Sequence, residues 1–123
     1  MNGIPRLINL DVSSISKKIQ AAQTIILSTH KQCDGDGLGA QLSLFHALKK
    51  IGKDVRAICV DEVPTKYKYL NTDQHVDVFE KPNAPIKESD LCLIFDTNDS
   101  RLVQPLYSTL QEKTKEVLFG DHH

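Results

Sequence analysis

The sequence predicts a single α/β domain of the three-layer, Rossmann-like kind, in which helices flank a mostly parallel sheet of about five strands. Short apolar runs rich in β-branched residues alternate with stretches of helical periodicity, as in strand–helix–strand units. The chain has 123 residues and is 40% hydrophobic, which is enough for one core. We see no internal repeat, low-complexity tract or linker, so residues 1–123 are treated as one domain.

The first half of the chain predicts two helices and two strands. Amphipathic spacing indicates a helix over 11–23, and the apolar run 24–29 indicates a buried strand. A polar loop then leads to a second helix, for which Asp36 is the expected N-cap and Gly52 the residue that follows its end. A strand at 54–60 follows, and a strand joined to a strand through a helix implies a parallel, right-handed crossover.

The second half predicts further short elements, among which the apolar run 91–95 is the clearest strand and is expected inside the sheet. A proline at position 105 is tolerable in the last helix only near its first turn. The remaining expected elements are a short helix at 64–70, a weak strand at 76–79, a surface loop at 81–89, a helix at 102–112 and a strand at 117–119.

Composition narrows the possible partners and location. The formal net charge is -1 with both signs interspersed, so we expect no binding to long duplex nucleic acid or to a membrane. No signal peptide or 20-residue apolar stretch is present, and we expect a cytoplasmic protein. Three widely spaced cysteines are expected to be reduced, with Cys59 and Cys92 in the core. Cys33 lies in the polar loop, where a role in metal binding stays open.

Polar side chains gather where three predicted strands end. His30, Asp34 and Asp36 follow the first strand, and Asp96 follows the strand at 91–95. The last strand leads into Asp121, His122 and His123. Because ligands bind at the carboxyl edge of open parallel sheets, these clusters are expected to converge in one crevice.

Imidazole and carboxylate groups together suit a divalent ion such as Mn²⁺ or Mg²⁺. The donors exceed the needs of one ion, and two ions about 3.5–4 Å apart would form the clamp used to attack phosphorus esters. Each piece has another interpretation: Asp34 and Asp36 as turn and cap residues, Asp96 as the cap of the next turn, and the terminal histidines as a loop end or part of a tag. Their joint occurrence at three strand ends favours the metal site.

Three other polar residues are given structural roles. His46 falls on the second predicted helix and His75 in a polar loop, so surface or packing roles are expected for both. Arg101 follows Asp96 by five positions and is expected to be solvated, with contact to a phosphate as the alternative.

The motifs resemble those of the DHH phosphoesterase family. The resemblance rests on the run H-x-x-x-D-G-D at 30–36, on Asp96 in F-D-T-N-D, and on D-H-H at 121–123, and it covers about residues 24–123. The run T-H-K-Q-C-D-G-D-G-L-G-A is most similar to the branch of nano-oligoribonucleases and phosphatases of 3′-phosphoadenosine 5′-phosphate. Many relatives carry proline where this chain has Cys33.

This resemblance implies a ligand set and roles for the candidate residues. It implies two divalent ions, Mn²⁺ foremost with Mg²⁺ or Co²⁺ as alternatives. One ion would be held by His30 and Asp34, the other by Asp36 and His122, with Asp96 bridging them. The resemblance further implies that His123 contacts the scissile phosphate and that Asp121 supports the site from behind.

It also implies a substrate class and an incomplete site. The expected substrates are small phosphorylated molecules: short oligonucleotides or nucleotide bisphosphates, cleaved by hydrolysis of a phosphoester bond. Relatives have a further aspartate and a C-terminal substrate-binding domain after D-H-H, so we expect a truncated chain with impaired activity. The alternatives are a non-enzymatic domain that binds metal or nucleotide, and a structural domain with relic motifs.

Overall fold

A single parallel sheet forms the centre of the computed structural model, which describes residues 12–70, 75–80 and 85–120. The strand order is β3-β2-β1-β4-β5, and every neighbouring pair is parallel. The strands are β1 (Thr24–Thr29), β2 (Asp54–Cys59), β3 (Val76–Val78), β4 (Leu91–Phe95) and β5 (Val117–Gly120). This confirms the predicted fold class.

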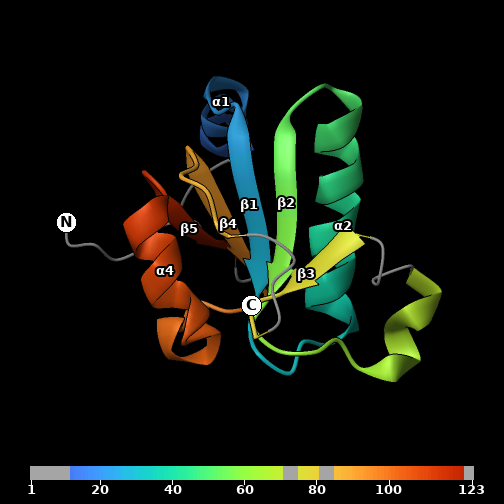
Figure 1. Cartoon of the computed structure of the whole chain (residues 1–123). Helices are drawn as coiled ribbons and strands as arrows, with labels where there is room; N and C mark the ends of the chain where they lie inside the picture. The colour runs from blue at the N-terminus through green and yellow to red at the C-terminus, as the bar shows by residue number, and fades with distance from the viewer. Residues whose placement is uncertain (1–11, 71–74, 81–84, 121–123) are drawn as a thin grey trace.

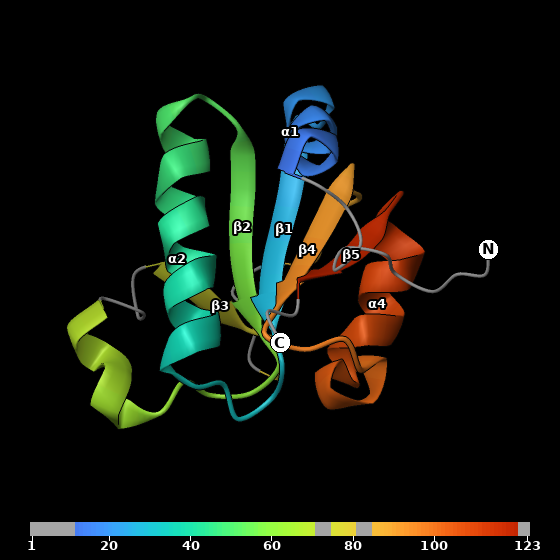
Figure 2. The ribbon, with the colours of Figure 1, turned by 180° about the vertical axis from the view of Figure 1, so that it is seen from behind.

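Helices cover both faces of this sheet, which makes three layers (Figures 1 and 2). Side chains of α2 (Gly35–Lys50) pack with one set of strand residues, and the end of α1 (Val12–Ala21) joins the same core. On the opposite face α4 (Leu106–Lys113) and the 3₁₀ helix η3 (Ser100–Val103) cover a second core. The alternation of Ile25 and Leu27 toward α2 with Ile26 toward α4 follows from the two-residue period of a strand.

The structure corrects two predictions about the helices. Asp34, and not Asp36, caps α2: its backbone is extended and its Oδ1 accepts a hydrogen bond from the Gly37 N–H at 3.0 Å. The expected helix at 102–112 is divided into η3 and α4, and Pro105 lies between them at the N-cap position of α4. The segment predicted as a helix at 64–70 is the 3₁₀ helix η2 (Thr65–Leu70).

A buried glutamine joins α2 to the sheet. The side chain of Gln41 is fully buried, and its Nε2 donates to the carbonyl oxygens of Leu27 and Ile58 at 2.8 and 3.3 Å. Its Oε1 accepts from the Cys59 thiol at 3.6 Å. The glutamine therefore links β1, β2 and α2 through polar contacts inside an apolar core.

Replacing Gln41 by methionine should destabilise the chain by about 1–3 kcal/mol, because buried carbonyl oxygens lose a donor. Urea unfolding of Gln41→Met measures the change, with Gln111→Met as the control because Gln111 is exposed on α4. Equal stabilities of the two variants would contradict this role for Gln41.

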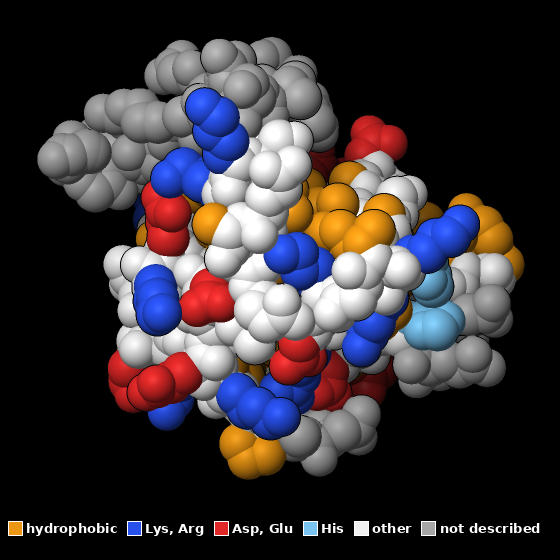
Figure 3. Space-filling view, turned by 90° about the horizontal axis from the view of Figure 1, so that it is seen from above, with side chains coloured by type: hydrophobic (Ala, Val, Ile, Leu, Met, Phe, Trp, Pro, Cys, Tyr) orange, Lys and Arg blue, Asp and Glu red, His pale blue; other side chains and the backbone are white. Residues whose placement is uncertain are grey.

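The amino ends of the strands lie at the end of the sheet opposite the arrowheads in Figure 1, and Figure 3 looks onto that end. Basic and acidic side chains are interspersed there around a small hydrophobic patch (Figure 3).

Cys33, Cys59 and Cys92 are free thiols and all three are buried. Among the described residues, no helix is long and apolar enough to cross a lipid bilayer.

Candidate metal centre

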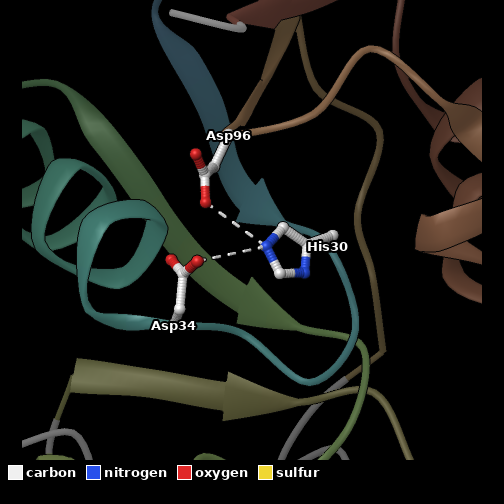
Figure 4. Close-up of side chains that lie close together, drawn as sticks. All are labelled: His30, Asp34 and Asp96. Atoms are coloured by element: carbon white, nitrogen blue, oxygen red, sulfur yellow. Dashed lines mark hydrogen bonds and ion pairs between the residues drawn. The ribbon is translucent and has the colours of Figure 1, made fainter. Parts of the chain in front are cut away.

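Three side chains meet at the carboxyl edge of the sheet and point toward one another (Figure 4). His30 Nε2 lies 3.3 Å from Asp96 Oδ2 and 3.9 Å from Asp34 Oδ2. One donor atom from each of the three residues lies within 4.8 Å of the others. This spacing allows one cation to contact all three residues.

The sheet itself brings two of these residues together. Thr29 of β1 pairs with Phe95 of β4, so His30 and Asp96 are the next residues of two adjacent parallel strands. Asp96 has a left-handed backbone (φ +67°), and its N–H donates to the carbonyl oxygen of Gly120 at 2.8 Å. Strand β5 therefore ends beside the site. The third residue, Asp34, is the N-cap of α2.

The two carboxylates differ in their surroundings. Asp34 is 55% exposed, and its pKa is lowered mainly by the hydrogen bond from the Gly37 N–H. Asp96 is only 17% exposed, and its pKa is raised by burial and by the neighbouring Asp34 carboxylate. The site thus has a charged carboxylate at its open side and a less readily ionised one at its base.

His30 is oriented to offer a ring nitrogen to a cation. Its Nδ1 lies 2.7 Å from the carbonyl oxygen of Lys31, a pure acceptor, so Nδ1 carries the proton and donates. Nε2 faces the carboxylates of Asp34 and Asp96, where it donates a hydrogen bond when protonated and can offer its lone pair to a cation when it is not. Histidines that bind metals have this arrangement, with the second ring nitrogen hydrogen-bonded to a carbonyl or carboxylate. The donor set fits a divalent ion.

The other residues that the sequence marks out are distributed differently. Asp36 is exposed in the first turn of α2 and is not among the three clustered donors. Asp121, His122 and His123 lie outside the described residues. Arg101 is 87% exposed and binds the Asp99 carboxylate, as expected for a solvated arginine. The rings of His46 and His75 pack edge-on against each other, with centroids 4.8 Å apart, which confirms a packing role.

Sequence reasoning missed one carboxylate near this site. Both oxygens of Asp61 accept a hydrogen bond from the Gln32 N–H, at 3.0 and 3.2 Å, and so hold the loop between His30 and Asp34. Asp61 follows β2 at the same edge of the sheet. The rule that selected Asp96 from its place after a strand would also have selected Asp61.

Cation binding at this site is expected to weaken as the pH falls. Burial lowers the pKa of His30, but the Lys31 carbonyl and the carboxylates of Asp96 and Asp34 outweigh burial and raise it above 6.5. Since the cation needs the neutral ring, affinity should decline about tenfold per pH unit below that raised pKa. Calorimetric titrations with Mn²⁺ at several values from about pH 8.5 to about pH 5.5 measure the affinity. The control variant His75→Gln should show the same pH dependence as the unmodified chain. A flat profile would contradict His30 as a ligand.

Comparison with known proteins places the chain in a family. The profile of the DHH family, N-terminal domain, matches residues 24–123. The chain belongs to the DHH family. The matched range contains His30, Asp34 and Asp96, so the three clustered donors are part of its DHH domain.

A solved structure supports the fold. An exopolyphosphatase-related protein from Bacteroides fragilis superposes with a TM-score of 0.79 at 21% sequence identity, over 90% of this chain. The match covers 34% of that protein, so this chain spans about a third of its length. No significant match to a curated protein was found. The comparisons support a DHH domain without selecting a branch of the family.

Proposed function

We propose that this DHH domain is the metal-binding part of a phosphohydrolase that acts on small phosphorylated substrates. The observation that carries the proposal is the convergence of His30 Nε2 with the carboxylates of Asp34 and Asp96 at the carboxyl edge of the sheet. Family membership and the exopolyphosphatase-related structural neighbour favour the same reaction class. Manganese is the proposed ion because the family resemblance implies it, and the combination of nitrogen and carboxylate donors is compatible with it.

Each residue of the cluster has a definite task in this proposal. His30 offers Nε2, and the Lys31 carbonyl keeps the proton on the far side of the ring. Asp96 offers its carboxylate oxygens to the ion from the buried base of the site. Asp34 offers its own from the exposed side of the site, where a phosphate can approach. When bound, a divalent ion supplies Lewis acidity and lowers the pKa of a water near the phosphorus.

The finer assignments follow from the motifs and belong to the same proposal. Asp36 and His122 are proposed for a second ion, His123 for contact with the scissile phosphate, and Asp121 for support of the site. Short oligonucleotides and nucleotide bisphosphates are the proposed substrates, as in the nano-oligoribonuclease branch. Three buried, reduced cysteines favour a reducing compartment, and we propose the cytoplasm.

The test is Mn²⁺-dependent hydrolysis of a dinucleotide and of a nucleotide bisphosphate, with polyphosphate as the comparison substrate. Release of mononucleotide or phosphate should require the ion and should be lost in Asp34→Asn. That variant keeps the helix cap, because asparagine caps as well as aspartate, but removes the charge. Mn²⁺ binding without hydrolysis of any substrate would favour a non-enzymatic binding domain. A chain that binds no divalent ion would refute the proposal.

A further inference from the structure

The loop between His30 and Asp34 is held from two sides. On one side the Lys31 N–H donates to the carbonyl oxygen of Leu102, in η3, at 2.7 Å. On the other side the Gln32 N–H donates to the Asp61 carboxylate that follows β2. Gln32 itself has a left-handed backbone (φ +53°), a conformation that a non-glycine residue adopts at some cost. The Asp61 contact therefore holds the loop at the residue where its backbone is least favoured.

A single peptide group links Asp61 to His30. The Gln32 N–H and the Lys31 carbonyl belong to the same peptide group. The two groups point in opposite directions, and each makes one hydrogen bond. The N–H donates to Asp61, and the carbonyl oxygen accepts from His30 Nδ1 at 2.7 Å. The chain of contacts runs from the carboxylate through the peptide to the imidazole and ends at Nε2, which faces Asp34 and Asp96.

We propose that Asp61 is a positioning residue for the metal centre, acting on His30 through the Lys31–Gln32 peptide group. A carboxylate on the N–H polarises the peptide, and a polarised peptide presents a stronger acceptor at its carbonyl oxygen. The stronger acceptor holds the proton on Nδ1 and keeps Nε2 available to the cation. Histidine ligands often contact a carboxylate directly, and here the peptide group transmits the same influence.

Asp61 does not act as a ligand in this proposal. It is absent from the three donors that cluster among the described residues, and both its oxygens face the Gln32 N–H. The inference rests on the proposed metal site at His30, although the hydrogen bonds of the relay are made by the chain's own residues alone. The relay and the metal site can therefore be tested separately.

The relay is tested on the full chain with Asp61→Ala, Asp61→Asn and a control, Glu88→Ala, whose side chain is exposed near the amino end of β1. Nitrogen-15 NMR of the metal-free chain at alkaline pH reads the tautomer of the neutral His30 ring. We expect Nδ1–H in the unmodified chain, in Glu88→Ala and in Asp61→Asn, whose amide oxygen still accepts from Gln32. Asp61→Ala should show a mixture of tautomers.

The metal is probed by Mn²⁺ titration of the same proteins. Asp61→Ala should lose about 10–100-fold in affinity, the range found when partners behind a ligand are removed. Asp61→Asn should retain most of the affinity. An unchanged tautomer in Asp61→Ala, equal affinities of Asp61→Ala and Glu88→Ala, or an Asp61→Asn as weak as Asp61→Ala would each overturn the proposal.

The test remains decisive in two further cases: if Asp61→Ala does not fold, and if the unmodified chain binds no Mn²⁺. If Asp61→Ala does not fold, hydrogen exchange of the Gln32 amide in the unmodified chain decides, since a bonded amide exchanges slowly and rapid exchange would overturn the relay. If the unmodified chain binds no Mn²⁺ yet shows the Nδ1–H tautomer and its loss in Asp61→Ala, the proposed function fails while the relay stands.

Discussion

Replacing Asp96 by asparagine is expected to abolish most cation binding while leaving the metal-free fold intact. Asp96 supplies the most buried carboxylate of the cluster, and losing a direct ligand should cost at least about 100-fold in Mn²⁺ affinity. Asparagine tolerates the left-handed backbone at φ +67°, so the turn after β4 can persist. Calorimetric titration with Mn²⁺ measures the loss.

The same substitution should act in the opposite direction on the metal-free chain. Burial and the Asp34 carboxylate raise the pKa of Asp96, so the folded state penalises its charge. A neutral amide relieves this penalty, and with a chelator present Asp96→Asn should be as stable as the unmodified chain or up to about 1 kcal/mol more stable.

Thermal unfolding with and without Mn²⁺ separates these two effects of Asp96→Asn. The ion should raise the melting temperature of the unmodified chain and of Glu88→Gln, but not of Asp96→Asn. A variant that melts well below the unmodified chain in chelator would show that Asp96 is mainly structural.

Replacing Gly37 by alanine is the second substitution with a large expected effect. A Cβ at Gly37 would collide with Thr29 Oγ1 and would lie 3.2 Å from the Cβ of Asp96. Thr29 is fully buried, and its hydroxyl donates to the Phe95 carbonyl oxygen at 2.8 Å, so it has little room to move. We expect a loss of about 1–3 kcal/mol in unfolding free energy, as in other overpacked cores. Mn²⁺ affinity should fall about tenfold as Asp96 is displaced.

Gly39→Ala is the matched control for this prediction. Gly39 is two residues further along α2, and a Cβ there would meet nothing within 4 Å. Alanine inside a helix is favoured over glycine by about 0.5–1 kcal/mol, so this variant should be more stable, with unchanged Mn²⁺ affinity. If both variants lost stability equally, general strain in α2, and not the contact with Thr29 and Asp96, would be responsible.

The strands were predictable because their signal is local. The runs at 24–29 and 91–95, which β-branched and apolar residues dominate, have the bounds of β1 and β4, since a strand buried on both faces is rich in such residues. The helix cap was not predictable in the same way. Asp34 and Asp36 both precede the apolar face of α2, and only the bond from the Gly37 N–H identifies Asp34 as the cap.

The interior of the molecule also contains features that a hydrophobic pattern misses. Gln41 is a polar residue on the apolar, buried face of α2. It can be fully buried there because its amide donates hydrogen bonds to the carbonyl oxygens of Leu27 and Ile58. The helix expected at 102–112 is interrupted because Pro105 supplies no backbone N–H to continue η3 into α4.

By itself the sequence determined the alternation of strands and helices and the donor chemistry at the strand ends, because residue type and periodicity express both. Only the tertiary structure decided which carboxylates face His30 and which ring nitrogen is available. Those outcomes depend on contacts between distant segments: Lys31 with Leu102, Gln32 with Asp61, and Asp96 with Gly120. Such contacts exist only once the parallel sheet has aligned the ends of its strands, and no local pattern encodes them.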